Sequence, residues 1–383
     1  DKEIERVVFN EITKKAVTHG IENPRQIEPL LVDAYMARRA LDYLVGFNIS
    51  PILWTKLPGS KSAGRVQSVA LKLITEREHE IELFKPEEFW TLSINFQDTN
   101  KSNITASISQ LDGEKIEKFS FKNKEEIEKA ISNIKTKKFN ITDISSKVVS
   151  RNPSGPFTTS TLQQVASSRL GFGASRTMQI AQKLYQGIEI EGDTVGLITY
   201  MRTDGTNLSA DAVSDFRKFI KKKYGNEYLP ENPNNYSGKK AKNAQEAHEA
   251  IRPTDINRNP DSVKKYLSSD QQKLYSLIWS RALSSQMETA KFDRNTITIE
   301  SEDGKTICKS SGSVLKFDGF LKVYSNQSKD DDEQILPEMS KGPINIEALI
   351  DEQHFTQPPP RYSEASLVCL LYTSPSPRDA IPS

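Results

Sequence analysis

The chain has 383 residues, with 52 lysines and arginines against 51 aspartates and glutamates, and 36% of its residues are hydrophobic. The mean hydropathy of -0.58 predicts a soluble protein, and the length predicts about two to four domains. No apolar run is long enough to span a membrane, and the charged first residues exclude a secretory signal, so we expect a cytoplasmic protein. Two cysteines, Cys308 and Cys369, cannot form a disulfide framework or a four-cysteine zinc site. The net charge of +1 excludes a uniformly basic nucleic-acid coat and leaves only local basic patches.

The first part of the chain has helical patterns that give way to strand patterns. Apolar residues between 28 and 47 recur at a 4-3-4-3 spacing, which predicts an amphipathic helix. A turn rich in Gly, Ser and Lys follows Pro51, and a second helical pattern begins near Ser62 and continues through the charged run 75–82. From Phe89 onward, short alternating runs rich in Ile, Thr and Ser indicate strands.

Helical character returns at Thr159, where the pattern predicts a helix, a turn and a second helix. Residues 196–200 then read as a short apolar strand, followed by a polar loop and a helix capped by Ser209. Strand-like runs reappear at 295–301, 313–324 and 344–350. The simplest arrangement is a β domain whose sequence is interrupted by a helical domain, because strands on both sides of the insert can complete one sheet.

Two windows, 49–75 and 151–188, are basic and contain no acidic residue. Their cations include Lys56, Lys61, Arg65, Lys72, Arg151, Arg169, Arg176 and Lys183. Such segregation favours binding of a polyanion, because phosphate contacts draw on Lys, Arg, small hydroxyl residues and helix N-termini. Solvated helix faces are the alternative. Phe47 and Trp54 lie at or just upstream of the first window, where each could stack on an unpaired base or belong to a core.

Ser62 stands at the expected N-cap of the second helix, with Ala63, Gly64 and Arg65 in its first turn. Free backbone N–H groups and a guanidinium could therefore converge on one phosphate. Capping of the helix without any ligand is the alternative.

The segment GLITYMRTD places Tyr200 at the end of an apolar run, followed directly by Arg202 and Asp204. A tyrosine there could act as a nucleophile on phosphorus, with Arg202 and His248 supplying hydrogen bonds and charge to the transition state. A strand-edge tyrosine in water and an exposed histidine on a helix are the alternative. The four histidines show no metal-ligand spacing, so we expect no metal bound by this chain.

Several motifs in a fixed order resemble those of the bacterial DNA topoisomerase I family, the type IA enzymes. The resemblance extends from about Arg6 to Val368. The motifs are RVVFNEIT (6–13), ARRALDYLVGF (37–47), SPILW (50–54), SAGRVQSVALKLI (62–74), PEEFW (86–90), GPFTTSTLQQVASSRLGF (155–172), GLITYMRTDGTNLS (196–209), EAHEAIRPT (246–254) and PPPRYSEASLV (358–368).

The resemblance implies an ATP-independent topoisomerase that relaxes negatively supercoiled DNA. Tyr200 would form a 5′-phosphotyrosine link and leave a 3′-hydroxyl, Arg202 would hold the scissile phosphate, and His248 would assist. The other strand would pass through the break before religation. Residues implied to line the groove for single-stranded DNA are Arg38, Arg39, Asp42, Phe47, Trp54, Ser62, Ala63, Gly64, Arg65, Val66, Gln67 and Arg202. The implied partner is single-stranded DNA within supercoiled DNA, and the implied setting is the bacterial cytoplasm and nucleoid, without a membrane. We expect a monomer.

The family fold implied is a multidomain α+β torus fragment: a helical domain, a β-rich arch and an inserted tyrosine domain. The boundaries expected are a Toprim-adjacent end at 1–27, the first part of the helical groove domain at 28–84, the β-rich arch at 85–154 and 289–356, the tyrosine domain at 155–288, a return to the helical domain at 357–368 and a non-native tail at 369–383.

The chain also departs from the family pattern. The resemblance implies that family members begin with a Toprim domain whose Asp and Glu cluster binds Mg²⁺, and we expect this sequence to start just after that domain. We therefore expect Mg²⁺ only in the full-length enzyme, and weak DNA binding with little or no cleavage by this chain alone. The alternative is a non-enzymatic, inactive fragment that binds single-stranded DNA, or binds duplex DNA through the helix–turn–helix at 159–186.

Overall fold

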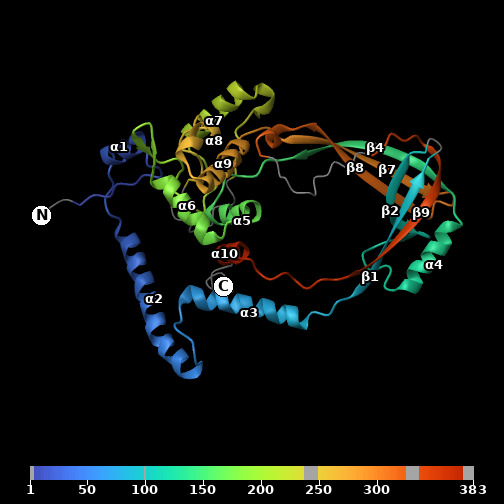
Figure 1. The fold of residues 1–383 in the computed structure, drawn as a ribbon, viewed down its shortest axis with the longest axis horizontal. Helices are drawn as coiled ribbons and strands as arrows, with labels where there is room; N and C mark the ends of the chain where they lie inside the picture. The colour runs from blue at the N-terminus through green and yellow to red at the C-terminus, as the bar shows by residue number, and fades with distance from the viewer. Residues whose placement is uncertain (1–3, 99–100, 237–248, 325–335, 374–383) are drawn as a thin grey trace. The chain divides into compact units, whose positions relative to one another are not determined.

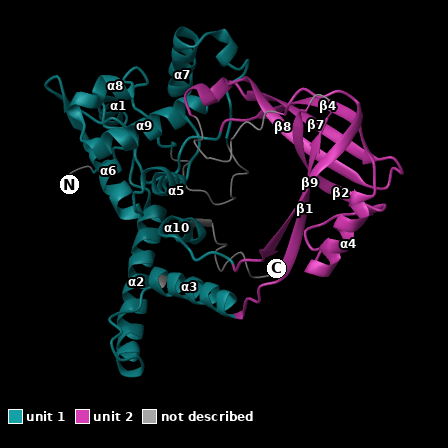
Figure 2. Ribbon diagram, turned by 45° about the vertical axis from the view of Figure 1, so that its right-hand side comes forward, with its two compact units in different colours: residues 1–82, 154–286, 359–383 teal, residues 83–153, 287–358 magenta. Residues whose placement is uncertain are grey.

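The computed structural model describes residues 4–98, 101–236, 249–324 and 336–373. The chain divides into two compact units, which Figure 2 draws in separate colours. Unit 1 comprises residues 1–82, 154–286 and 359–383, and unit 2 comprises residues 83–153 and 287–358. The predicted interruption of a β domain by a helical one is confirmed, because strands from both sides of the insert pair in one sheet.

Unit 2 is built on an antiparallel sheet. Its described elements are β1 Glu88–Gln97, β2 Asn103–Leu111, β3 Glu114–Lys115, α4 Lys124–Lys135, β4 Phe139–Arg151, β7 Ala290–Ser301, β8 Ile307–Phe317, the 3-10 turn η3 Gly319–Lys322 and β9 Gly342–Phe355. The strand order is β1-β9-β4-β7-β8-β2-β3, and β1 also pairs with β2. The ladder from β1 round to β2 therefore closes on itself, with β4 and β9 paired only between residues 139–141 and 342–344.

The core of unit 2 follows from the alternation in its strands. Along β2 every second residue, Ile104, Ala106 and Ile108, is buried, as a period-2 pattern requires. Phe96 and Phe139 meet edge to face, with ring centroids 5.3 Å apart, at the centre of the same cluster.

Helix α4 is a difference from our expectation of strands alone in this region. The segment is highly charged, but Ile127 and Ile134 recur at helical spacing and are fully buried against the sheet. Asn123 caps the helix by accepting a hydrogen bond from the backbone N–H of Glu126.

The predicted helix–turn–helix is confirmed in unit 1. Its helices are α5, Thr159–Leu170, and α6, Ala174–Gln186, joined at Gly171, whose φ of 67° is the left-handed conformation that glycine adopts most easily. Both helices pack against α9, Ser269–Ser284 (Figure 1). The other described elements of this part are β5 Ile188–Ile190, β6 Asp193–Val195, α7 Ala210–Lys223, η1 Asn226–Tyr228, α8 Pro260–Val263 and η2 Lys264–Tyr266.

The remaining helices of unit 1 come from the two ends of the chain. They are α1 Lys14–Glu22, α2 Pro29–Lys56, α3 Arg65–Leu83 and α10 Glu364–Thr373. Helix α2 runs on through Pro51, where we had expected a turn to follow. Proline removes one helical N–H only, and the hydrogen bonding is intact again where the Leu57 N–H donates to the Leu53 carbonyl at 2.8 Å.

A short segment before α10 links two parts of unit 1. Arg361 forms an ion pair with Glu78 of α3, with Nε 2.7 Å from Oε1. Glu364 accepts a hydrogen bond at 3.0 Å from the backbone N–H of Ala174, the first residue of α6. Residues 361–364 therefore connect α3 to the helix–turn–helix.

One carboxylate in unit 2 predicts a pH dependence of its stability. The Ser301 hydroxyl, the Lys305 N–H and the Lys137 ammonium all contact Asp303 and lower its pKa to about 2. A lowered pKa stabilises the fold above the unfolded pKa, and that contribution is lost as the pH falls toward about 2. Calorimetry of the whole chain should show a lower Tm for Asp303→Asn at pH 7, with the difference vanishing on acidification. The control Glu114→Gln, which removes an exposed carboxylate of β3, should show no such trend. A constant Tm difference at every pH would contradict this assignment.

Candidate active site and nucleic-acid interface

The segment that carries Tyr200 is held by the first residues of the chain. The Gly196 N–H donates to the Ile12 carbonyl at 3.1 Å, and the Tyr200 N–H donates to the Asn10 carbonyl at 2.8 Å. The predicted strand at 196–200 is wrong, because only an isolated bridge between Ile198 and Pro253 forms there. The backbone groups of the segment pair with several separate parts of the chain and not with one neighbouring strand.

A second set of hydrogen bonds fixes the residue before the tyrosine. The Thr199 N–H donates to the Arg252 carbonyl at 2.9 Å, and the Thr199 hydroxyl donates to the Ala250 carbonyl at 2.7 Å. The same hydroxyl accepts from the Arg252 N–H at 3.0 Å. Every polar group of this fully buried threonine side chain is therefore paired.

Between residues 196 and 201, only the tyrosine reaches the surface. Ile198 and Thr199 are fully buried and Met201 is 1% exposed, whereas Tyr200 is 37% exposed. Its ring meets the ring of Tyr185 on α6 edge to face, with centroids 5.3 Å apart. Burial, and to a lesser extent the neighbouring Tyr200, raises the pKa of Tyr185. The two phenols are therefore not equivalent: Tyr200 is the more accessible.

Arg252 is a buried cation that ties this region together, and we did not identify it from the sequence. It is 7% exposed, and its guanidinium forms ion pairs with Glu249 at 2.6 Å and with Glu11 at 3.1 Å. Glu249 also accepts a hydrogen bond at 2.8 Å from the N–H of Ser209. Ser209 is the N-cap of α7, as predicted. A buried guanidinium needs such paired carboxylates, because an uncompensated charge there is costly.

Arg202 is exposed and has no hydrogen bond or ion pair within the part of the chain that the structure describes. Its guanidinium is therefore available to an anion close to Tyr200. His248, the other predicted catalytic residue, lies outside the described residues. The described part of its motif, residues 249–254, is not helical, in contrast to the helix we had considered as the alternative.

The predicted groove residues on α2 include a stripe of exposed aromatic side chains. Phe47 and Trp54 are 66% and 58% exposed, and Phe47 stacks on Tyr43 with centroids 4.2 Å apart. Arg39, Tyr43 and Phe47 follow at intervals of four, which places them along one face of the helix. Arg38 and Asp42 are also exposed on α2. Tyr43 was missed by our reading, although its spacing from Phe47 was the available signal.

The predicted N-cap at Ser62 is wrong, because α3 begins at Arg65 and the Gly64 carbonyl accepts the Ser68 N–H at 2.8 Å. The preceding residues are instead bound to α2. The Ala63 N–H donates to the Ser50 hydroxyl at 3.0 Å, and the Trp54 indole donates to the Lys61 carbonyl at 2.7 Å.

Ala63 and Gly64 therefore precede the helix, whereas Val66 and Gln67 belong to its exposed first turn. No hydrogen bond, ion pair or ring contact in the described ranges joins these α2 and α3 residues to Tyr200 or Arg202. The predicted site residues therefore fall into two separate groups, one around Tyr200 and one on α2 and α3.

The side chains present do not fit a magnesium site. Within the described residues, no group of three or more His, Cys, Asp or Glu is arranged to hold a metal ion. Glu11 and Glu249, two acids of the segments that bind the tyrosine backbone, are paired with Arg252. We therefore assign no step of the chemistry below to a metal.

A family model described as DNA topoisomerase matches residues 26–374. The chain belongs to the bacterial type IA DNA topoisomerase family. Curated relatives named DNA topoisomerase 1 are 51% identical in Rickettsia felis and 52% identical in Rickettsia typhi, each over 96% of this chain and 48% of the relative. This topoisomerase chain therefore spans about half the length of the curated relatives it matches.

A solved structure of full-length topoisomerase I from Thermotoga maritima is also similar. It has a TM-score of 0.78 and 36% sequence identity, over 96% of this chain and 57% of that one. The predicted α+β fold class is confirmed by this likeness. In the described part of this topoisomerase chain, no helix is long and apolar enough to cross a membrane.

Substitution of Gly196 should displace the tyrosine segment. A Cβ there would lie 2.6 Å from the Tyr185 carbonyl and 3.0 Å from the Ile12 carbonyl, and neither backbone atom can easily move. Gly196→Ala should therefore lower the stability of this topoisomerase chain by about 1–3 kcal/mol. Gly46→Ala is the matched control, because the nearest atom is 3.9 Å away and alanine favours the helix. Equal calorimetric Tm values for the two variants would contradict the packing described.

Removal of the buried Arg252 charge should destabilise the chain most when its two carboxylate partners remain charged. Arg252→Met leaves Glu11 and Glu249 without their cation, and we expect a loss of about 3–5 kcal/mol in urea denaturation. The triple variant Arg252→Met, Glu11→Gln, Glu249→Gln should recover part of that loss, because no unpaired charge remains. No recovery would mean that packing, and not charge, sets the cost.

Proposed function

We propose that this chain carries the nucleophile and the strand-binding surface of an ATP-independent type IA DNA topoisomerase. The observation that carries the proposal is an exposed tyrosine that follows a buried segment, with Arg202 beside it making no hydrogen bond or ion pair to any described residue. Membership of the family, over residues 26–374, supports the same role. The substrate we propose is single-stranded DNA within negatively supercoiled DNA.

In the proposed reaction the Tyr200 hydroxyl oxygen attacks the phosphorus of a phosphodiester. The new bond joins the tyrosine oxygen to phosphorus, and the bond from phosphorus to the 3′ oxygen breaks. The phenolic proton is lost and a proton ends on the 3′ oxygen, so a 5′-phosphotyrosine and a 3′-hydroxyl result. One phosphodiester replaces another, and the reverse reaction therefore needs no ATP.

The rigid surroundings of Tyr200 support this role through positioning. Hydrogen bonds to Asn10 and Arg252 fix the backbone at the attacking residue and at the residue before it, which reduces the entropy lost on reaching an in-line geometry. Arg202 would hold the phosphate through charge-assisted hydrogen bonds as negative charge develops on it. We propose that His248 assists in the same pocket.

The exposed stripe of α2 supports the binding of an unpaired strand. Tyr43, Phe47 and Trp54 offer aromatic surfaces for bases, and Arg38 and Arg39 offer cations for phosphates. We propose that this stripe and the turn at 62–67 bind the strand to be cleaved, and that the chain acts as a monomer. Strand passage and relaxation require the complete enzyme, whose Mg²⁺ we place in a Toprim segment beyond this sequence.

The experiment uses a DNA substrate whose cleavage does not need catalytic groups from outside this chain. In this single-stranded oligonucleotide, sulfur replaces the 3′ bridging oxygen at one linkage. The thiolate leaves without being protonated, so formation of the adduct tests only the nucleophile and the binding of the phosphate. On a denaturing gel, we expect a covalent protein–DNA adduct with this chain, and little or none with an all-oxygen oligonucleotide. Tyr200→Phe should abolish the adduct, and Arg202→Lys should slow its formation about 10-fold to 100-fold.

Tyr185→Phe is the matched control, because it removes the neighbouring phenol and should leave the adduct intact. An adduct that persists in Tyr200→Phe would refute the proposal. No adduct together with sequence-specific duplex binding would favour the second candidate, a DNA-binding helix–turn–helix formed by α5 and α6.

A further inference from the structure

A groove on α6 adjoins the tyrosine segment. Its volume is about 460 Å³, within the range of small-ligand sites. Two cations and three amides line it, namely Arg202, Lys183, Gln179, Gln182 and Gln186. No aspartate or glutamate is among its lining residues. The groove is thus basic and rich in neutral hydrogen-bonding groups.

The polar groups of this groove are not engaged by the protein. Among the residues that the structure describes, neither Arg202 nor Lys183 has a hydrogen bond or ion pair, and the three glutamine side chains also have none. The buried residues of α6, among them Ile180 and Leu184, lie on the other side of the helix and form the core contact. The groove therefore presents ligand-binding groups that the fold does not use.

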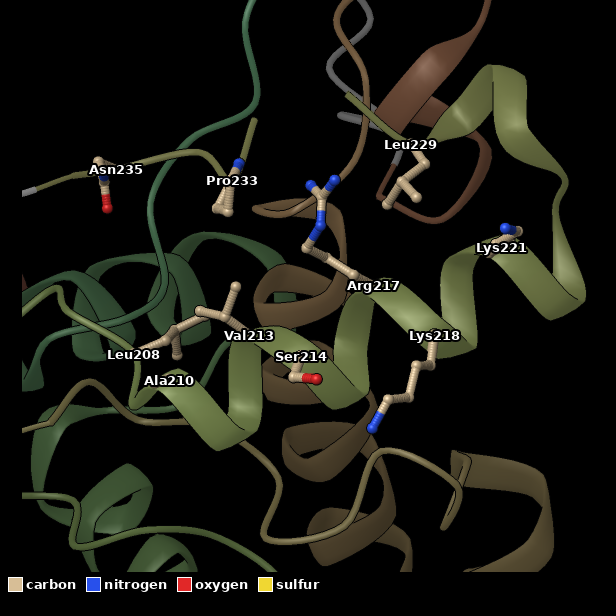
Figure 3. Close-up of a pocket in the computed structure, with 10 residues that line it drawn as sticks. All are labelled: Leu208, Ala210, Val213, Ser214, Arg217, Lys218, Lys221, Leu229, Pro233 and Asn235. Carbon is tan, nitrogen blue, oxygen red and sulfur yellow. The ribbon is translucent and has the colours of Figure 1, made fainter. Parts of the chain in front are cut away.

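A second hollow in unit 1 has cations that are already in use (Figure 3). Arg217 donates to the carbonyls of Pro230 and Glu231, and Lys218 pairs with Asp215. Figure 3 shows Arg217 directed toward Leu229 and Pro233 and Lys218 directed away from them. Because these cations already have partners, we propose no ligand for that hollow. Its exposed Lys221 is a suitable position for a control substitution that removes one positive charge.

The groove on α6 and Tyr200 meet at the last turn of that helix. Tyr185, whose ring touches the Tyr200 ring, lies between Gln182 and Gln186 in the sequence of α6. Arg202 itself lines the groove, two residues beyond the tyrosine. A phosphate bonded to the Tyr200 oxygen would therefore have its attached nucleoside beside this groove.

We infer that the α6 groove binds the first nucleotide of the strand that becomes attached to Tyr200, on the 5′-phosphate side of the break. Arg202 and Lys183 bind its phosphates, and the glutamine amides hydrogen-bond the edges of its base. Met178, on the same groove, offers a thioether to the face of the base. This inference rests on the proposed function and adds a subsite for the strand that the enzyme retains.

The chemistry of the two DNA ends provides the test. A hexanucleotide with a 5′-phosphate mimics the retained strand, and the same hexanucleotide with a 5′-hydroxyl lacks the group that Arg202 and Lys183 bind. By fluorescence anisotropy with this chain, we expect about 10-fold tighter binding of the 5′-phosphorylated probe. Lys183→Gln should remove most of that preference, and Gln182→Ala should weaken binding of both probes.

Lys221→Gln is the matched control, because it removes the same charge from an exposed helix position that faces the other hollow. The inference is overturned if the unaltered chain binds both probes equally, or if Lys183→Gln and Lys221→Gln reduce the preference to the same extent. Failure of the proposed function has a different signature: no adduct forms with the sulfur-containing oligonucleotide. A 5′-phosphate preference without any adduct would also overturn the inference, since no strand is then retained on Tyr200.

Discussion

The placement of Tyr200 depends on a buried arginine more than 50 residues further along the chain. The guanidinium of Arg252 binds Glu11 and Glu249, while its backbone pairs with Thr199. Glu11 follows Asn10, whose carbonyl accepts the Tyr200 N–H. One residue therefore joins the start of the chain, through its side chain, and the tyrosine segment, through its backbone, to the motif that contains His248. Because a charge buried this deeply needs its partners, the three segments form a single arrangement.

Rigidity of the backbone and exposure of the side chain are combined at this position. The residues on either side of Tyr200 are buried and hydrogen-bonded, whereas the phenol is exposed. Arg217 and Arg252 bind carbonyls or carboxylates, whereas Arg202 and Lys183 have no hydrogen bond or ion pair among the residues that the structure describes. The first two cations maintain the fold, and the other two are those that we propose bind DNA.

The sequence predicted those features that depend on local periodicity. The spacing of α2, the alternation of β2 and the helix–turn–helix of α5 and α6 each follow from residues close together in the chain. It could not predict the Arg252 network, because its ion pair with Glu11 joins residues with no shared pattern. The prediction that Ser62 caps a helix was wrong for a related reason: Ser50 and Trp54 bind residues 61–63, and helix α3 starts later. Tyr200 and Arg202 were proposed as site residues from motifs and not from periodicity.

Hydrogen exchange at the backbone of residues 196–202 tests the central claim most directly. If the segment is held as described, the amides of Thr199 and Tyr200, which donate to Arg252 and Asn10, exchange as slowly as the interior of α5 and α6. They should also become much faster in Arg252→Met. Fast exchange of both amides in the unaltered chain, at the rate of an exposed loop, would contradict the account.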